Sequence, residues 1–195
     1  MFKRIFDWLK PIAAAVILLA ALQLTGLLSS VSFYTQTAAL ETGILDATTT
    51  PDKTGDTFNF GFVLKDMQGN RVNFDDYKGK VVFLNMWATW CGPCRAEMPA
   101  IQKLYESVQD PKIAFVMLSI DTDDKKDKVL SYVKKNNYTF PIFMPSGQLP
   151  DQLRVPSIPT TFLISKEGKV ILKEVGTTNY NTKKFRELLK SEASK

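Results

Sequence analysis

Two cysteines, Cys91 and Cys94, are the residues of this sequence best suited to chemistry, and they are its whole cysteine content. They stand three positions apart in a chain without histidine. A scaffold of structural disulfides needs more cysteines at wider spacing, and a zinc site needs a second pair of Cys or His ligands. The pair therefore indicates a redox site that cycles between dithiol and disulfide. It predicts no metal and no cofactor other than the Cys91–Cys94 disulfide itself.

The flanking segments place this pair between a buried strand and a helix. Val81–Trp87 is an almost continuous apolar run, typical of a strand that is covered on both faces of a sheet. A helical pattern follows the cysteines to about Val108. Unpaired N–H groups and the helix dipole stabilise a thiolate at a helix N-terminus, and only the thiolate attacks a disulfide. Cys91 is therefore the predicted nucleophile, and Cys94, one turn later, would resolve the mixed disulfide.

A static disulfide, or two inert core thiols, is the alternative interpretation of the same pair. A bond between residues three positions apart closes too small a loop to stabilise the chain much. The position at a strand–helix junction also favours chemistry over a purely structural role. We therefore treat Cys91 and Cys94 as catalytic residues.

Glu97 is a carboxylate on the apolar side of the predicted helix. At 100° per residue this helix carries an apolar stripe, which is formed by Cys94, Met98, Ile101, Leu104, Tyr105 and Val108. Glu97 projects inside that stripe, one turn from Cys94. Burial would raise its pKa and suit it to proton exchange with the neighbouring thiol. The alternative is a side chain that reaches the surface or pairs with Arg95 or Lys103.

Strands and helices alternate along the rest of the chain. Extended segments are predicted at Phe58–Leu64, Arg71–Phe74, Ile113–Ile120, Phe140–Met144, Thr160–Ile164 and Lys169–Val175. Further helices are predicted at Asp124–Asn136 and Thr182–Ser191. The first two strands would form an N-terminal β-hairpin extension. The order of elements predicts an α/β fold with a central mixed β-sheet flanked by helices.

The first forty residues form a separate, apolar region. Residues 11–40 carry no charged side chain, and residues 11–33 are long enough to cross a bilayer as a helix of about 20 residues. Basic residues precede this span, and none follows it until Lys53. The positive-inside rule then places residues 1–10 in the cytoplasm and the remaining chain outside. We expect a single-pass protein of the cytoplasmic (inner) membrane whose domain is extracytoplasmic or periplasmic. A signal peptide cleaved near residues 37–39 is the alternative.

Residues 34–57 read as a linker, and residues 58–195 as the catalytic domain. The linker is rich in Thr, Ala, Asp and Gly, and it would hold the domain away from the membrane. The net charge of +5 is spread along the chain rather than gathered in a basic stripe. We therefore expect no nucleic-acid partner. We also expect the domain to be monomeric.

Two motifs in the domain resemble those of a known family. Residues 81–99, with Trp-Cys-Gly-Pro-Cys at 90–94, resemble the active-site segment of the thioredoxin superfamily. More narrowly, they resemble its TlpA/ResA-like branch of membrane-anchored, extracytoplasmic thiol–disulfide oxidoreductases. Residues 158–164 resemble the second signature of that family. The likeness covers about residues 58–190 and implies a thioredoxin-like fold.

The resemblance also implies roles for individual residues. Pro159 would be a catalytic-site proline in the cis form beside the disulfide, and the backbone of Ile158 would pair with the bound substrate. An acidic residue at the position of Glu97 is thought to exchange protons with the buried thiol in this branch. The residues predicted to contact substrate are Trp90, Gly92, Pro93 and Ile158. Asn85 departs from cytoplasmic thioredoxins, which carry a buried Asp there, and this strengthens the case for Glu97.

Reduction of disulfides in exported proteins is the predicted function. The Gly-Pro dipeptide between the cysteines resembles that of reducing thioredoxins, whose potential is about −270 mV. Within the family the substrates include apocytochrome c thiols, and electrons would come from a membrane thiol donor. A thiol peroxidase of the peroxiredoxin kind is one alternative, but Ala88 stands where its pattern requires Thr. A redox-inactive tethered binding module is the other.

Overall fold

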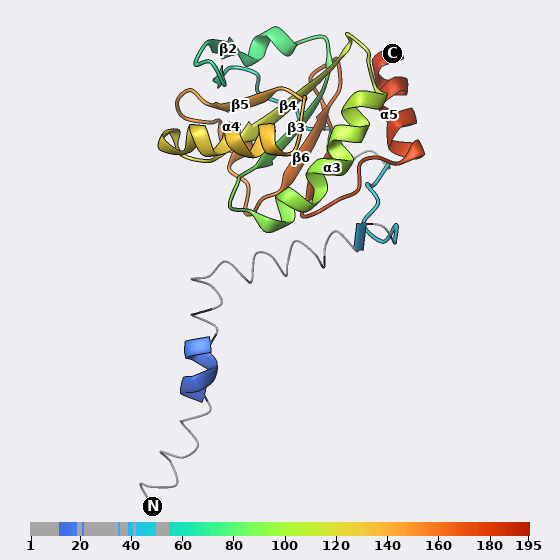
Figure 1. The fold of residues 1–195 in the computed structure, drawn as a ribbon. Helices are drawn as coiled ribbons and strands as arrows, with labels where there is room; N and C mark the ends of the chain where they lie inside the picture. The colour runs from blue at the N-terminus through green and yellow to red at the C-terminus, as the bar shows by residue number, and fades with distance from the viewer. Residues whose placement is uncertain (1–11, 19–20, 22–34, 36–38, 41, 50–54) are drawn as a thin grey trace, which may run out of the picture.

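The computed structural model describes residues 12–18, 21, 35, 39–40, 42–49 and 55–195. The strands are β1 (Val63–Asp66), β2 (Arg71–Asn73), β3 (Val81–Trp87), β4 (Ile113–Ser119), β5 (Ile142–Pro145), β6 (Thr160–Ile164) and β7 (Val170–Val175). The α-helices of the domain are α3 (Gly92–Ser107), α4 (Lys126–Lys135) and α5 (Lys183–Ser194). Three short 3₁₀ turns, η1 (Phe74–Tyr77), η2 (Asp123–Lys125) and η3 (Asp151–Leu153), join them (Figure 1).

One mixed sheet runs through the middle of the domain in the order β2-β1-β5-β4-β3-β6-β7. β3 pairs in parallel with β4 along its whole length, and β4 pairs in parallel with β5. The other neighbours are antiparallel, including β3 with β6. The fully buried strand β3 therefore lies inside the sheet, between β4 and β6, and its C-terminal end leads directly to the two cysteines. The predicted α/β fold with a central mixed sheet is confirmed.

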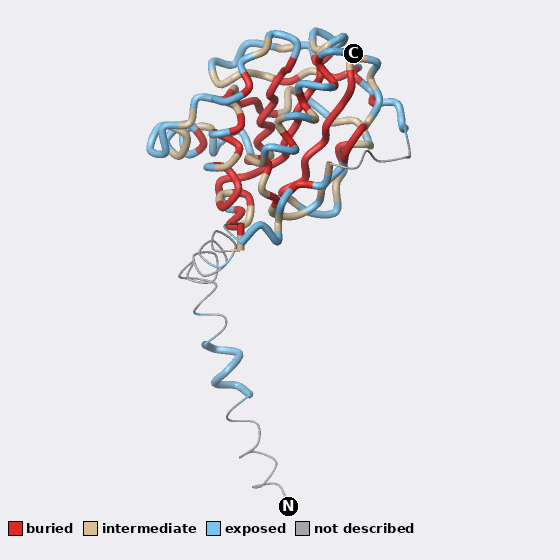
Figure 2. The backbone as a smooth tube through the Cα atoms, turned by 90° about the vertical axis from the view of Figure 1, so that its right-hand side faces the viewer, coloured by how far each residue is buried: buried red, intermediate tan, exposed pale blue. Residues whose placement is uncertain are grey.

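The three helices α3, α4 and α5 cover one face of this sheet (Figure 1). Alternate residues of β3 and β4 point into this layer, as the two-residue period of a strand requires. They pack with apolar residues of the helices, among them Met98, Ile101, Leu104, Val129, Phe185 and Leu189. In the tube view the buried stretches of the chain, in red, run through the interior of the domain, and most exposed stretches, in pale blue, lie at its outside (Figure 2). This layer fixes α3 against β3 and so fixes the place of the cysteines.

Aromatic side chains cover the opposite face. Phe58, Phe60, Phe62 and Phe74 are all buried there, and the rings of Phe62 and Phe74 stack with centroids 4.4 Å apart. The prediction of a strand from Phe58 is wrong for its first part, because β1 begins only at Val63. The alternating phenylalanines do face the core, but their backbone does not form a regular ladder with a neighbouring strand. The amide of Phe62, for example, donates to the carbonyl of Phe60.

The predicted hairpin of the first two strands is present, and it is part of the main sheet. β1 pairs with β2 on one side and with β5 on the other. It therefore forms the edge of the central sheet, where we had expected an extension beside it. The turn that connects the two strands is held by Asp66, whose carboxylate accepts hydrogen bonds from the amides of Gln68 and Asn70.

A threonine hydroxyl caps the N-terminus of the last helix, α5. The hydroxyl of Thr182 accepts a hydrogen bond from the amide of Phe185 at 3.1 Å, so Thr182 is the N-cap of α5. The helix continues to Ser194, three residues beyond the predicted end. The predicted helix from Asp124 is also present, but its first turn is the 3₁₀ turn η2 before α4 begins.

The predicted cytoplasmic segment (residues 1–10) and most of the predicted anchor (residues 11–33) lie outside the described residues. Within the parts of the chain that the structure describes, we find no helix with both the length and the apolar character needed to cross a membrane. The predicted linker (residues 34–57) is described in part. Its residues Leu45 and Ala47 pair with Asn179 of the domain, as discussed below.

Candidate active site

Cys91 and Cys94 form a disulfide at the N-terminus of α3. Cys91 is the N-cap residue, and its sulfur accepts a hydrogen bond from the amide of Cys94 at 3.1 Å. Cys91 is 5% exposed, whereas Cys94 has no exposed surface. Only the sulfur of Cys91 is therefore open to a partner. This asymmetry agrees with the predicted roles of nucleophile and resolving thiol.

The helix N-terminus supplies the electrostatics that a nucleophilic sulfur needs. α3 is 16 residues long, and the donor that already contacts the Cys91 sulfur is one of its unpaired first-turn amides. In the reduced protein this amide and the helix dipole favour the negative charge of a thiolate. Pro93 in the first turn costs no hydrogen bond, since the amide it lacks has no partner inside the helix.

Ile158, which directly precedes Pro159, lies against the disulfide although it is far from it in the sequence. The Ile158–Pro159 peptide bond is cis, as the resemblance implied. The carbonyl oxygen of Ile158 lies 3.7 Å from the sulfur of Cys91. This proximity follows from the pairing of β6 with β3, which brings the start of β6 to the end of the central strand.

The other residues predicted to contact substrate surround the same point. Trp90 is 60% exposed beside the buried Cys91, whereas Trp87 is fully buried in the core. Gly92 is buried and Pro93 is half-buried at the first turn of α3. Trp90 and Ile158 also line an apolar groove of about 510 Å³, together with Met86, Ile120, Leu149, Leu153, Arg154, Val155, Pro156 and Ser157. The structure thus brings all the predicted site residues together.

Glu97 is completely buried, three residues after Cys94 on α3. Its two oxygens accept hydrogen bonds from the side-chain amide of Asn85 at 2.7 Å and from the backbone amide of Thr178 at 3.1 Å. Burial raises the pKa of Glu97 from 4.5 to about 8, although these two hydrogen bonds favour the ionised form and oppose the rise. The carboxyl group can therefore take up and release a proton near neutral pH. The carboxyl group thus does not reach the surface, as one alternative required, and its donors include Asn85 and Thr178.

Sequence reasoning missed most of the polar residues around Glu97. Asn85 also donates to the hydroxyl of Thr161 at 2.9 Å, while its own oxygen is buried without a partner among the described residues. Thr178 contributes through its backbone amide, which leaves no mark on the sequence. Tyr180 is fully buried nearby, and burial, followed by the charge of Glu97, raises the pKa of its phenol. Of these residues only Asn85 on β3 carried a signal in the sequence, because it stands where cytoplasmic thioredoxins have a buried Asp.

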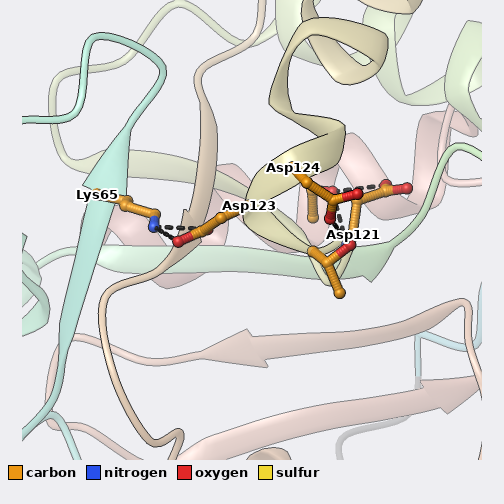
Figure 3. A network of polar contacts seen from close by, with 6 residues as sticks. Lys65, Asp121, Asp123 and Asp124 are labelled. Carbon is orange, nitrogen blue, oxygen red and sulfur yellow. Dashed lines mark hydrogen bonds and ion pairs between the residues drawn. The ribbon is translucent and has the colours of Figure 1, made fainter.

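A second polar cluster holds the loop that leads into the cysteines. Asp121 is 5% exposed at the end of β4 (Figure 3). Its carboxylate accepts hydrogen bonds from the amide of Thr89 at 2.8 Å, from the Thr89 hydroxyl at 2.7 Å and from the Ser119 hydroxyl at 2.9 Å. Lys65 and Asp123 form a separate ion pair close by, at 2.6 Å. Asp121 thereby fixes the backbone two residues before Cys91.

Replacing Asp121 with Ala is expected to destabilise the protein by about 1–3 kcal/mol, because the buried amide of Thr89 loses its acceptor. It should also lower the reductase rate, because the loop that carries Trp90 into Cys91 is no longer held. Asp121→Asn is the matched control, since its remaining oxygen can still accept from Thr89. Urea unfolding and disulfide-reduction assays measure the two effects. Equal behaviour of Asp121→Ala and the wild type would contradict this role.

Comparison with known proteins agrees with this geometry. A family model described as AhpC/TSA family matches residues 55–173. The chain belongs to the AhpC/TSA family. Its fold within that family is the thioredoxin-like α/β fold described above.

Relatives of this family member carry names that refer to thiol chemistry. The chain is 37% identical over 156 residues to the thiol-disulfide oxidoreductase ResA of Geobacillus thermodenitrificans, covering 80% of this chain and 81% of that protein. It is 34% identical to the thioredoxin-like protein YneN of Bacillus subtilis, covering 87% and 92%. The match to ResA of Bacillus cereus, 38% identical, spans 59% of this chain and 66% of that protein. The ResA relatives and the Cys91–Cys94 pair both support oxidoreductase activity.

Solved structures of similar proteins have the same fold. A putative thiol:disulfide interchange protein DsbE from Chlorobium tepidum aligns with a TM-score of 0.59 and 28% identity, covering 71% of this chain and 98% of that one. StoA from Bacillus subtilis aligns with a TM-score of 0.54 and 26% identity, covering 65% and 94%. The predicted resemblance to the ResA-like branch of the thioredoxin superfamily is confirmed.

Proposed function

We propose that this protein reduces disulfides of exported proteins through a Cys91/Cys94 dithiol–disulfide cycle. The observation that carries the proposal is the position of the Cys91 sulfur, at a helix N-terminus and 3.7 Å from the Ile158 carbonyl, while Cys94 is fully buried. One sulfur is reachable and electrostatically favoured as a thiolate, and the other can be reached only from within the protein. That arrangement suits attack followed by internal resolution.

The cycle begins with the reduced protein. The Cys91 thiolate attacks one sulfur of a substrate disulfide, forming the mixed disulfide, and the other substrate sulfur leaves as a thiolate that takes a proton. Cys94 then gives up its proton and attacks the Cys91 sulfur, so that the second substrate sulfur leaves. Two electrons pass from the protein to the substrate, and the Cys91–Cys94 disulfide remains. A thiol donor must reduce that disulfide before the next turnover.

Glu97 is the proposed acceptor for the Cys94 proton. Its pKa of about 8 leaves a fraction of the carboxyl group ionised near neutral pH, and Cys94 precedes it by one helical turn in the same buried layer. A base of matched pKa is the most effective partner for a thiol that has to ionise away from solvent. The reverse transfer would return the proton when the disulfide is reduced again.

Substrate would dock across the site along Ile158. The backbone of this residue precedes Pro159 and faces the sulfur of Cys91, so an extended substrate strand can pair with it while its cysteine meets the nucleophile. Trp90, Gly92 and Pro93 would contact the same strand from the helix side. The apolar groove beside Trp90 and Ile158 has the size to receive a neighbouring apolar side chain.

The cellular setting of the reaction is part of the proposal. The apolar, uncharged residues 11–33 and the basic residues before them support a single-pass anchor in the inner membrane, with the domain on the periplasmic side. Disulfides persist in that compartment, so exported proteins are the substrates within reach. The resemblance to the ResA-like branch favours apocytochrome c among them, with a membrane thiol protein as the electron donor.

The two alternatives have less support. A peroxidase of the peroxiredoxin kind would need Thr in place of Ala88, three residues before Cys91. A redox-inactive binding module would not need an intact cysteine pair beside Ile158 and Pro159. We therefore retain disulfide reduction as the proposed activity.

Insulin reduction by the full-length chain, purified in detergent and supplied with dithiothreitol, tests the proposal. The wild-type protein should accelerate the precipitation of the insulin B chain, and Cys91→Ser should not rise above the rate with dithiothreitol alone. Hydrogen peroxide offered as a competing oxidant tests the peroxidase alternative in the same preparation. Equal insulin reduction by the wild type and Cys91→Ser would overturn the proposed function.

A further inference from the structure

The loop of residues 176–181, which we call the clamp loop, touches the active site at three places. The amide of Gly176 donates to the carbonyl of Pro159 at 2.9 Å. The hydroxyl of Thr177 donates to the carbonyl of Pro93 at 3.4 Å. The amide of Thr178 donates to Glu97 at 3.1 Å. One short loop thus joins the proline beside the disulfide, the first turn of α3 and the buried carboxyl group.

The outer side of the clamp loop is held by a segment from far upstream. Residues 45–48, which we call the docking segment, run parallel to the loop at Asn179. The amide of Asn179 donates to the carbonyl of Leu45 at 2.6 Å, and the amide of Ala47 donates to the carbonyl of Asn179 at 3.0 Å. The side-chain amide of Asn179 donates to Asp46 at 2.9 Å. Three hydrogen bonds therefore converge on the residue that follows Thr178.

Packing shows that the docking segment belongs to the domain. Ala47 is 9% exposed and joins the same apolar cluster as Tyr180, which is itself fully buried in the clamp loop. Beyond Ala47, the amide of Thr48 donates to Glu174 of β7 at 3.3 Å. Upstream, Leu40 is also buried and lines a shallow pocket of about 300 Å³ with Pro99 of α3 and Asn181. The predicted linker thus fastens to the domain at the back of the active site.

We propose that the docking segment is a positioning element of the redox site, which holds the Thr178 amide on Glu97 by pairing with Asn179. The inference rests on the proposed function, because it assigns to this contact the control of the proton that Glu97 exchanges with Cys94. Asp46, Ala47 and Asn179 act through Thr178 and touch neither sulfur.

The direction of the effect follows from the groups that face Glu97. Its carboxyl group accepts hydrogen bonds from the side-chain amide of Asn85 on β3 and from the backbone amide of Thr178 in the clamp loop. The phenol of Tyr180, also in the clamp loop, lies near it. On its own helix, Cys94 is its partner in the proposed transfer. Both amides stabilise the carboxylate against burial, and the pKa of the phenol is raised, so Tyr180 stays neutral. When the clamp loop is released, the carboxylate loses one of two donors and its pKa should rise further.

The test is a titration of the Glu97 carboxyl carbon by NMR in the oxidised full-length chain, labelled with ¹³C-glutamate and assigned with Glu97→Gln. Ala47→Pro removes the amide that pairs with Asn179, and Thr49→Pro is its matched control because it leaves that amide in place. Ala47→Pro should shift the midpoint upward by about one pH unit. Thr49→Pro should titrate like the wild type.

Asp46 gives a second comparison that does not depend on a proline. It is exposed, so neither of its variants should unfold the domain. Asp46→Ala removes both the charge and the acceptor for Asn179, whereas Asp46→Asn removes only the charge. An upward shift in Asp46→Ala that is absent in Asp46→Asn supports the clamp. An unshifted midpoint in Asp46→Ala and in folded Ala47→Pro overturns it.

The outcome is independent of the proposed activity. The titration reports on the Glu97 carboxyl group whether or not the protein reduces insulin. If wild-type insulin reduction fails while the midpoints shift as described, the proposed function falls and the positioning contact stands. If reduction succeeds and the midpoints do not move, the clamp is wrong and the proposed function stands.

Discussion

Cys94→Ser should stop turnover and leave substrate proteins covalently attached to Cys91. The serine hydroxyl cannot replace the buried thiol as the attacking group, so the mixed disulfide that forms at Cys91 has no internal route to resolution. The hydrogen bond from the backbone amide of residue 94 to the Cys91 sulfur is retained, because it comes from the main chain. The nucleophile therefore keeps its activation while the second step is lost.

The trap is read by expressing the full-length variant in its host and separating adducts on non-reducing gels. Bands that disappear on reduction should contain substrate proteins, which mass spectrometry identifies. The double variant Cys91→Ser/Cys94→Ser is the control, because it has no sulfur to attack and should yield no adduct. Cys91→Ser, which keeps only the Cys94 sulfur, gives the contradicting outcome: adducts that form in this variant and are missing from Cys94→Ser would show that Cys91 is not the nucleophile.

The sequence was sufficient to predict the parts of the fold that depend on local burial. Val81–Trp87 is a strand with the predicted bounds, because seven consecutive buried residues leave few alternatives to a central strand. Phe58–Phe62 shows the limit of that reasoning. Its alternating phenylalanines have the period of a strand and do face the core, yet the backbone there forms no regular strand. The spacing of apolar residues indicates which side chains are buried, but it does not indicate the hydrogen-bond partner of each backbone amide.

The same limit applies to the site. Glu97 could be predicted because a carboxylate within an apolar stripe is conspicuous, and the structure confirms its burial. Its partner Thr178 could not be predicted, because it acts through its backbone amide, which does not depend on the type of residue. The role of Asp121 could not be predicted either. Its role depends on Thr89, 32 residues away, which the sheet brings next to it.

The buried carboxyl group of Glu97 should make the stability of the oxidised protein fall as the pH rises through neutrality. Below pH 4.5 the group is protonated in both the folded and the unfolded chain, and its contribution is fully present. Between 4.5 and about 8 the unfolded chain loses this proton while the folded protein keeps it, so the free energy of unfolding decreases. Above about 8 both states are ionised and the loss is complete. Each pH unit within the window costs up to about 1.4 kcal/mol, on the order of 5 kcal/mol in total.

Glu97→Gln should remove this dependence, because the amide cannot ionise. Urea unfolding of the oxidised wild type and Glu97→Gln at pH 5 and pH 9 measures the difference, and Glu187→Gln on the exposed face of α5 is the matched control. The wild type should lose more stability between the two pH values than Glu97→Gln, whereas Glu187→Gln should follow the wild type. The same substitution should slow disulfide reduction and flatten its rate–pH profile near pH 8, since Cys94 loses its proton acceptor. Parallel stability curves for the wild type and Glu97→Gln would mean that the carboxyl group ionises normally inside the fold, and Cys94 would then need another base.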